Sequence, residues 1–319
     1  MNSRPYSVKT FGFRGSWGQI HRLEEGFRRI GCHIAAEGDD FDFIYSNELL
    51  QDRAAIACKE RSGRPLIRHI HDLPALEGTP MQRSVEELQI HRQTVLDSAD
   101  IVTANTQFVA DQLEEYWGYH GAAVTGQPIQ FESDLTDFRD RRRRNLVAVI
   151  GRLDDPLKNV DLVLRALSKL RAPPDLAMVS VGKAKRNLRP SLFFFRRFRI
   201  ERHRELSPDG LAALLKEARM LLSPSLFEGL GLPPIEALSV GTPAIVSDIP
   251  VKREVFAGSP MLFHDPHDAK DLARAIQFLL DHEDAGWAMV TGFAPRIDAY
   301  RPETIARKIV DLYLSLGRG

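Results

Sequence analysis

The sequence predicts an α/β protein made of two doubly wound domains that face each other across a cleft. The chain has 319 residues, which is long for one open sheet and comfortable for two domains of about 150 residues each. In both halves, short apolar runs alternate with longer amphipathic stretches, as in βαβ units that build parallel sheets. Between the halves, Phe131–Asn145 is polar and charged without an apolar period, which indicates an interdomain linker.

Each predicted strand and helix is identified by this alternation. In the first half we expect strands over Ser7–Phe13, Cys32–Ala36, Phe41–Ser46, Pro65–Ile70, Ile101–Ala104 and Ala122–Thr125, with helices over Trp17–Ile30, Leu49–Arg61, Ser84–Ser98 and Gln107–Tyr116. In the second half we expect strands over Leu146–Ile150, Leu176–Val181, Met220–Leu222 and Ala244–Ser247, with helices over Val160–Leu170, Leu211–Ala218, Ala269–Leu280 and Pro302–Leu316, and one around Ala237–Val240.

These elements divide the chain into an N-terminal domain over residues 1–143 and a C-terminal domain over residues 144–300. The last helix, over residues 301–319, is expected to pack near or back on the N-terminal domain. In open α/β sheets, ligands bind beyond the carboxyl ends of the strands. With two such sheets facing each other, the binding site is expected in the cleft between them.

Composition and charge exclude several other classes of protein. Hydrophobic residues make up 43% and charged residues 27%, as in a soluble globular protein, and a formal net charge of zero gives no overall attraction to nucleic acid or anionic membranes. Cys32 and Cys58 have no metal-ligand spacing and suggest no disulfide framework. The N-terminus lacks the apolar region of a signal peptide, and no run of about 18 apolar residues occurs. We therefore expect a cytoplasmic protein without a transmembrane segment.

The segment Ser223–Asp248, SPSLFEGLGLPPIEALSVGTPAIVSD, carries the main chemical motif. A helix is expected to start near Pro233, because proline fits a first turn, where its missing N–H would be unpaired. The helix N-terminus would direct its N–H groups at the glycine-rich turn and favour an anion there. Glu228 precedes the turn and Glu236 is expected in the first helical turn, so both could flank one ligand. Taken alone, such a glycine-rich turn is more often only a tight turn, and a glutamate in a first helical turn is often only a partner of the helix dipole.

A second cluster, VAVIGRLDDPLK, occupies Val147–Lys158. Arg152 follows the carboxyl end of a buried strand, and Lys158 comes just before the next helix. An arginine fork and a mobile ammonium could together neutralise a diphosphate without a metal ion. The alternative is a pair of solvated surface charges.

Together, the two clusters resemble the donor-binding domain of family-four retaining glycosyltransferases of the GT-B fold, known as glycosyl transferases group 1. The family's Glu-x7-Glu motif is matched by Glu228 and Glu236, and its Gly-Arg…Lys pair by Arg152 and Lys158. The resemblance extends from Leu146 to about Leu316 and implies two Rossmann-like domains.

The resemblance also implies a role for each of these residues. Arg152 and Lys158 would hold the donor diphosphate and stabilise its leaving charge. Glu228 would hydrogen-bond the donor sugar, and Glu236 would bind the ribose hydroxyls. The backbone amides of Gly229, Leu230, Gly231 and Leu232 would lie near the donor. No cofactor and no metal ion are expected, and the nucleoside-diphosphate sugar would be a co-substrate.

The first domain resembles the family less closely. The turn that contains Gly15 and Ser16 follows the first strand, where the family places a glycine-rich turn under the donor phosphate. Its spacing is not GxGxxG, which argues against a dinucleotide site. His71, at the end of a strand, matches a family histidine near the donor sugar, and His69 is expected to face the same side of the sheet. The domain is short, so the acceptor pocket is expected to be open or built differently.

Two basic runs stand out, Arg139–Arg144 in the linker and Lys183–Arg204 with its Phe193–Phe195 cluster. Arginine beside aromatic residues is typical of a surface that binds a polyanion or an anionic membrane. The alternative is a strand or helix that buries its phenylalanines and leaves arginine in water. The sequence leaves both readings open for residues 183–204.

The leading hypothesis is a retaining hexosyltransferase that moves a sugar from a nucleoside diphosphate, such as UDP, to an acceptor hydroxyl. The acceptor is unknown: a glycan, a lipid, a small metabolite and a modified nucleic-acid base all fit. An epimerase of the same fold would release an isomerised sugar without any acceptor. A non-catalytic accessory subunit is the third hypothesis, against which stands the presence of all four charged residues of the motif.

Overall fold

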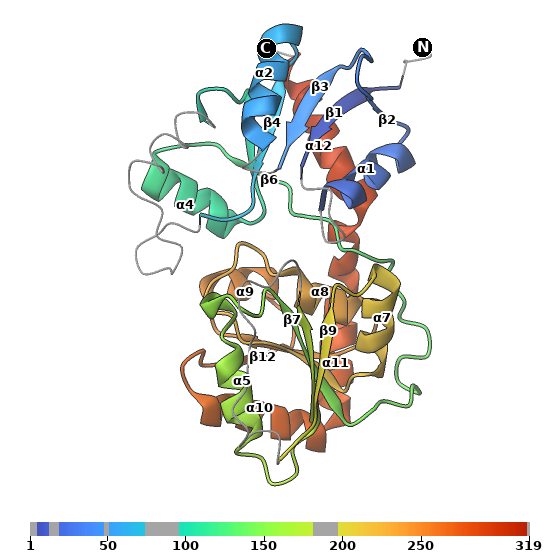
Figure 1. Cartoon of the computed structure of the whole chain (residues 1–319), viewed down its shortest axis with the longest axis vertical. Coiled ribbons are helices and arrows are strands. Elements are labelled where there is room, and N and C mark those ends of the chain that lie inside the picture. The colour runs from blue at the N-terminus through green and yellow to red at the C-terminus, as the bar shows by residue number, and fades with distance from the viewer. Residues whose placement is uncertain (1–4, 13–18, 48–50, 74–95, 181–196, 318–319) are drawn as a thin grey trace. The chain divides into compact units, whose positions relative to one another are not determined.

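The computed structural model describes residues 5–12, 19–47, 51–73, 96–180 and 197–317. The chain divides into two compact units. The first combines Met1–Ile129 with Asp298–Gly319, and the second is Gln130–Ile297. Figure 1 shows a sheet with helices in each unit.

The first unit contains a parallel six-stranded sheet in the order β2-β1-β3-β4-β5-β6. Its strands are β1 (Ser7–Phe11), β2 (His33–Ile34), β3 (Phe43–Ser46), β4 (Leu66–Ile70), β5 (Ile101–Ala104) and β6 (Ala123–Val124). Its helices are α1 (Gln19–Arg29), α2 (Asp52–Ser62), α4 (Gln107–Trp117) and α12 (Pro302–Leu316). The strand order reverses between β1 and β3, which makes their carboxyl ends a topological switch point.

Side-chain alternation along the strands places helices on both faces of this sheet. Phe43 and Tyr45 of β3 lie in a core with residues of α1 and α12, whereas Ile44 lies in a second core with residues of α2. A third core joins α4 to β4 and β5. The last helix, α12, thus completes the core of the first unit through Ile305 and Ile309, and it runs beside α1 in Figure 1.

The second unit contains another parallel six-stranded sheet, in the order β12-β11-β10-β7-β8-β9. Its strands are β7 (Leu146–Gly151), β8 (Asp175–Ser180), β9 (Ile200–Arg204), β10 (Met220–Ser223), β11 (Ala244–Ser247) and β12 (Leu262–His264). Its α-helices are α5 (Val160–Leu167), α7 (Pro208–Glu217), α8 (Leu232–Ser239), α9 (Pro250–Val255), α10 (Ala269–Asp281) and α11 (Glu283–Phe293), and η2 (Pro156–Lys158) is a 3₁₀ turn. A second 3₁₀ segment, η3 (Ala294–Tyr300), spans the junction between the two units. This strand order is that of a dinucleotide-binding sheet, with its switch point between β7 and β10.

Most expected elements recur with shifted ends, and among the described residues four strands and α-helices were not anticipated. These are β9, β12, α9 and α11. Strand β9 lies inside the basic run 183–204, where its sequence IERHR has no apolar alternation. It forms because it pairs in parallel with β8, from Leu176↔Ile200 to Ser180↔Arg204. Most of the helix predicted over Ser84–Ser98 lies outside the described residues.

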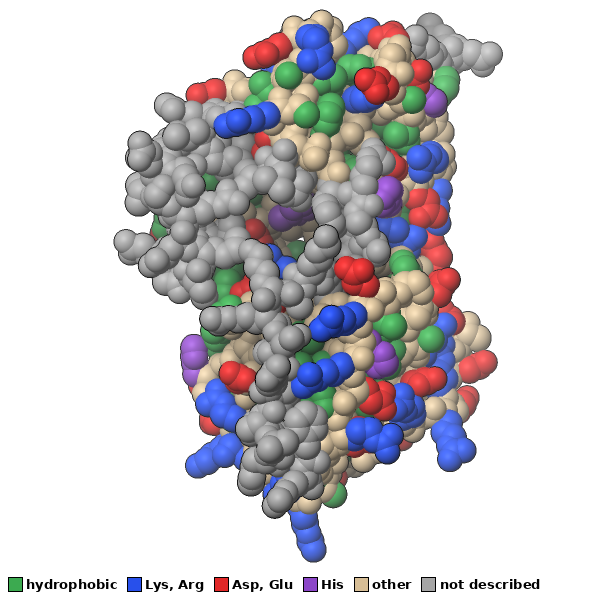
Figure 2. Space-filling view, in the orientation of Figure 1, with side chains coloured by type: hydrophobic (Ala, Val, Ile, Leu, Met, Phe, Trp, Pro, Cys, Tyr) green, Lys and Arg blue, Asp and Glu red, His purple; other side chains and the backbone are tan. Residues whose placement is uncertain are grey.

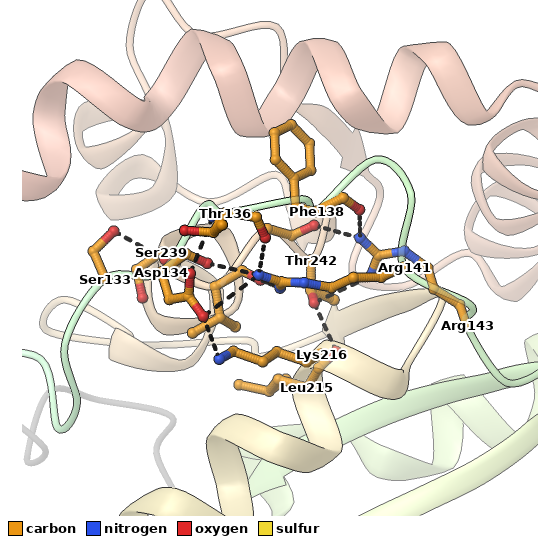
Figure 3. A network of polar contacts seen from close by, with 12 residues as sticks. Ser133, Asp134, Thr136, Phe138, Arg141, Arg143, Leu215, Lys216, Ser239 and Thr242 are labelled. Carbon is orange, nitrogen blue, oxygen red and sulfur yellow. Dashed lines mark hydrogen bonds and ion pairs between the residues drawn. The ribbon is translucent and has the colours of Figure 1, made fainter.

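The segment predicted as a linker packs closely on the second unit (Figure 3). Arg143 donates to the carbonyl oxygens of Ala218 at 2.9 Å and Gly241 at 2.6 Å, where α7 and α8 end. Arg141 donates to the carbonyl oxygen of Val240 at 2.5 Å, and Lys216 forms a 2.5 Å ion pair with Asp134. The guanidinium groups satisfy carbonyls that a helix end leaves unpaired.

Most of the segment predicted as an interdomain linker is therefore part of the second unit rather than a free connection. Residues 130–143, expected in the first domain, belong with the second unit. Gly241 shows how closely the segment approaches: it has φ of 83°, and a Cβ there would lie 2.3 Å from Cβ of Phe138.

Candidate functional site

Two loops meet at the switch point of the second sheet and carry opposite charges. Lys158 ends η2, after β7, and Glu228 follows β10. The backbone N–H of Leu226 donates to the carbonyl of Leu157 at 2.8 Å, and the side-chain amide of Asn159 donates to the carbonyl of Pro224 at 3.1 Å. These bonds, made by the residues on either side of Lys158, tie its loop to the segment just before Glu228, and Nζ of Lys158 lies 2.7 Å from Oε1 of Glu228.

Glu228 is held in its ionised form. Burial by itself would raise the pKa of this carboxyl, but the ammonium groups of Lys158 and Lys252 lower it to about 2. Hydrogen bonds from Lys158 and from the Ser225 hydroxyl, at 2.8 Å, act in the same direction. An ionised carboxylate that is only partly exposed is a strong acceptor for hydroxyl groups of a ligand.

Arg152, the other predicted cation, has a different partner. Its guanidinium forms a 3.1 Å ion pair with Asp155, three residues along the chain. The side chain is 58% exposed, against 19% for Lys158. The structure therefore brings Lys158 and Glu228 together and leaves Arg152 at the surface beside its own acidic partner.

The glycine-rich turn leads into α8 as the prolines predict. Gly231 precedes the helix with φ of 77°, and α8 begins at Leu232 with Pro233 in its first turn. Glu236 is the fifth helical residue, so the prediction that it lies in the first turn was wrong by a small margin. It is buried at 2% exposure, and its Oε1 accepts a 3.1 Å hydrogen bond from the N–H of Gln130.

Lys252 is a third charged residue at this turn, and the sequence did not single it out. It lies in α9, fully buried, with Nζ 3.3 Å from the carbonyl oxygens of both Leu230 and Gly231. Burial lowers its pKa to about 8, although Glu228 acts in the opposite direction. The available signal was a lysine that directly follows the apolar Val251 in the first turn of a proline-started helix, IPVKREV.

In the first unit, His71 follows the carboxyl end of β4 and lies within a polar cluster. Its Nδ1 contacts the side-chain amide of Gln127, and its carbonyl accepts a 2.7 Å hydrogen bond from Asn105. Burial, followed by the charge of Arg68, lowers the pKa of its imidazole to about 4. His71 is therefore neutral at physiological pH.

His69 lies next to His71, with ring centroids 5.0 Å apart, as expected for side chains on the same side of the sheet. It is fully buried between Thr103, at 2.8 Å from Nδ1, and Asn105, at 2.7 Å from Nε2. Burial holds the pKa of His69 well below its usual range. Asn105 therefore links the two histidines, because it contacts the ring of His69 and donates to the carbonyl of His71. Gly15 and Ser16, expected near a donor phosphate, lie outside the described residues.

The basic run 183–204 is described only from residue 197 onward. Within that part, Arg197 donates to the carbonyl of Leu170 at 2.6 Å, and Glu201 pairs with Arg144. On the face shown in Figure 2, Lys and Arg side chains are interspersed with Asp and Glu among the coloured residues.

Within the described ranges, no group of three or more His, Cys, Asp or Glu side chains is arranged to hold a metal ion. None of the helices in that same part of the chain has the length and apolarity needed to cross a bilayer.

Residues 144–282 match the family model described as glycosyl transferases group 1. The chain is 25% identical over 272 residues to an MMP alpha-(1->4)-mannosyltransferase of Mycolicibacterium hassiacum, covering 78% of this chain and 64% of that protein. It is 31% identical over 278 residues to a D-inositol 3-phosphate glycosyltransferase of Corynebacterium aurimucosum, covering 76% and 64%. The chain thus spans less than two thirds of the length of these relatives.

Solved structures with the same fold cover nearly the whole chain. Sucrose-phosphate synthase from Thermosynechococcus elongatus superposes with a TM-score of 0.79 at 17% identity, covering 99% of this chain and 100% of that chain. HepE from Anabaena, in complex with UDP-glucose, has a TM-score of 0.77 at 15% identity, covering 97% and 100%. The prediction of two Rossmann-like domains of the GT-B type is confirmed.

Proposed function

Residues 144–282 belong to the glycosyl transferases group 1, and from this premise we propose that the chain transfers a hexose-type sugar from a nucleoside diphosphate to an acceptor hydroxyl with retention of configuration. The observation that carries the proposal is the Lys158–Glu228 pair at the switch point of the second sheet, beside the turn into α8. A cation, an ionised carboxylate and a helix N-terminus there suit a sugar joined to a phosphate.

Each residue of the site has a role in this proposal. Lys158 neutralises the diphosphate and the charge that develops on it as the glycosidic bond breaks. Arg152 adds a second cation when a phosphate replaces Asp155 as its partner. Glu228 accepts hydrogen bonds from sugar hydroxyls, and Glu236, whose carboxylate is held by Gln130, binds the ribose. The amides of Gly229–Leu232 face the donor.

The proposed reaction is front-side attack by the acceptor hydroxyl on the anomeric carbon. The bond from that carbon to the leaving phosphate oxygen breaks, the new glycosidic bond forms, and the acceptor proton passes to the leaving phosphate. His71 has a neutral imidazole at physiological pH, so this scheme uses no imidazolium acid. No metal ion takes part in this scheme.

UDP is the first nucleotide to test, because HepE, a structural neighbour of the same fold, is described with UDP, glucose and UDP-glucose. The relatives named for D-inositol 3-phosphate favour a small phosphorylated polyol as the first acceptor to test. Glycans, lipids and modified nucleic-acid bases remain in the acceptor panel. The buried, unpaired thiols of Cys32 and Cys58 fit a reducing cytoplasm as the place of action.

The test is calorimetry with UDP, ADP and GDP, followed by incubation of the best donor sugar with the acceptor panel. NMR of the product should show an anomeric configuration equal to that of the donor. An inverted product would contradict the retaining mechanism. An isomerised free sugar nucleotide formed without acceptor would favour an epimerase. Binding of none of the diphosphates would favour an accessory subunit.

A further inference from the structure

Lys252 occupies an unusual position for a lysine. Its side chain is fully buried beneath the turn that joins Glu228 to α8. A Cβ at Gly231 would lie 1.9 Å from Nζ of Lys252, so the turn rests directly on the ammonium group. Because Gly231 also has φ of 77°, both its backbone conformation and this contact require glycine.

The two hydrogen bonds of Lys252 determine which way the turn presents its amides. Nζ attracts the carbonyl oxygens of Leu230 and Gly231, at 3.3 Å each. No cis peptide bond occurs in the described chain, and in a planar trans peptide the C=O and N–H point in opposite directions. The N–H groups of Gly231 and Leu232 therefore point away from Lys252.

Charge is a second property of this position. The charged groups whose fields act on Lys252 are Glu228, which precedes the turn, and Lys158 of η2. The two ammonium groups exceed the one carboxylate, so this cluster keeps positive charge for an anionic ligand. A neutral donor could satisfy the carbonyls of Leu230 and Gly231 without the cost of burying a charge. The charge of a lysine at this position therefore points to a role beyond hydrogen bonding to these carbonyls.

Resting on the proposed function, we infer that Lys252 is a positioning residue for the donor diphosphate. It orients the backbone N–H groups of Gly231 and Leu232 toward the phosphate. Its ammonium group also attracts the phosphate electrostatically.

This role makes phosphate binding depend on pH. Lys252 has a pKa of about 8, so it is largely protonated at neutral pH and largely neutral at about pH 9. A bound diphosphate favours the protonated form, so binding must weaken as pH rises through this range. A ligand without phosphate gains nothing from this charge.

The experiment compares Lys252→Met, Lys252→Gln and the wild-type chain. Methionine keeps the length of the side chain and removes both donor and charge, whereas glutamine keeps a donor for the carbonyls. Lys270→Met, at an exposed position of α10, is the matched control. Circular dichroism melts establish that each variant is folded, and calorimetry measures binding of UDP and of uridine at about pH 7 and about pH 9.

At neutral pH, Lys252→Met should bind UDP about tenfold or more weakly, with uridine affinity unchanged. Lys252→Gln should recover part of that loss through its amide. The wild-type chain and Lys270→Met should lose UDP affinity between pH 7 and pH 9 more steeply than Lys252→Met does.

Equal losses of UDP and uridine affinity in Lys252→Met, or identical pH dependence in all variants, would reduce Lys252 to a structural residue and overturn the inference. The proposed function would survive that outcome, since the wild-type chain still binds UDP. If the wild-type chain binds no nucleoside diphosphate, the proposed function fails and the inference falls with it.

Discussion

At the scale of single residues, the charged side chains at the turn before α8 come together through tertiary contacts. Lys158, Glu228 and Lys252 come from three separate segments and meet around one turn. Arg152, by contrast, finds Asp155 three residues away. The exposed Arg152–Asp155 pair contributes little to stability, because water screens it. The Lys158–Glu228 pair is partly buried and joins two loops that are far apart in sequence.

Glu228→Gln tests the ionised carboxylate. Its folded-state pKa is lowered from 4.5 to about 2, so its contribution to stability is present above pH 4.5 and is lost as pH falls toward 2. The free energy of unfolding of the wild-type chain should exceed that of Glu228→Gln by up to about 3 kcal/mol above pH 4.5. This difference should shrink as the pH falls from 4.5 toward 2. Urea unfolding at several pH values measures it, with Glu217→Gln, 54% exposed, as control. A difference that does not vary with pH would contradict the assignment.

The imidazole of His71 should remain neutral until the solution is strongly acidic. Its pKa of about 4 follows from burial and from the charge of Arg68. NMR of ¹³C-labelled histidine, assigned with His71→Asn, should show no titration of this ring between pH 8 and pH 5. A midpoint near pH 6 would mean that the ring is solvated and lies outside the cluster with His69 and Gln127.

At the scale of elements, two arginines of the basic run Arg139–Arg144 bind the C-terminal ends of helices. The carbonyls at the ends of α7 and α8 accept hydrogen bonds from Arg141 and Arg143, and Figure 3 shows both side chains extended across these ends. Cations are favourable at helix C-termini because the last carbonyls are unpaired and carry partial negative charge. Part of the basic run Arg139–Arg144 therefore caps the C-terminal ends of α7 and α8.

Arg143→Met should destabilise the second unit by about 2–4 kcal/mol, because it leaves several carbonyl oxygens, including those of Ala218 and Gly241, without this donor. Arg142→Met, one residue earlier at an exposed position, should change stability by less than about 0.5 kcal/mol. Thermal unfolding of both variants gives the comparison. Equal effects from the two substitutions would show that Arg143 does not cap these helices.

At the scale of the whole molecule, the chain returns to complete its first unit with its last helix. Ile305, Ala306, Ile309 and Val310 of α12 lie in one core with Val8, Phe27 and Phe43. The first unit therefore combines the two ends of the sequence, and its core is complete only when α12 is in place. The second unit is continuous in sequence and has its own sheet and helices.

Ile309→Asp should consequently unfold the first unit and leave the second folded, because a buried, unpaired carboxylate costs several kcal/mol. Hydrogen exchange should then be fast at the amides of β1 and β3 and still slow at those of β7 and β8. Asp311→Asn, exposed on the same helix, serves as the control and should leave both sheets protected. Loss of protection in both units together would contradict independent cores.

The sequence by itself determined the fold class, the alternation of strands and helices, and the Lys158 and Glu228–Glu236 motif, because apolar periodicity, proline at a helix start and glycine in a turn are local properties. The tertiary structure alone decided that Lys252 lies under Gly231, that Arg152 pairs with Asp155, that Arg141 and Arg143 cap α7 and α8, and that β9 is a strand. Most of these features depend on contacts between residues far apart in the chain, where burial and pairing override local pattern.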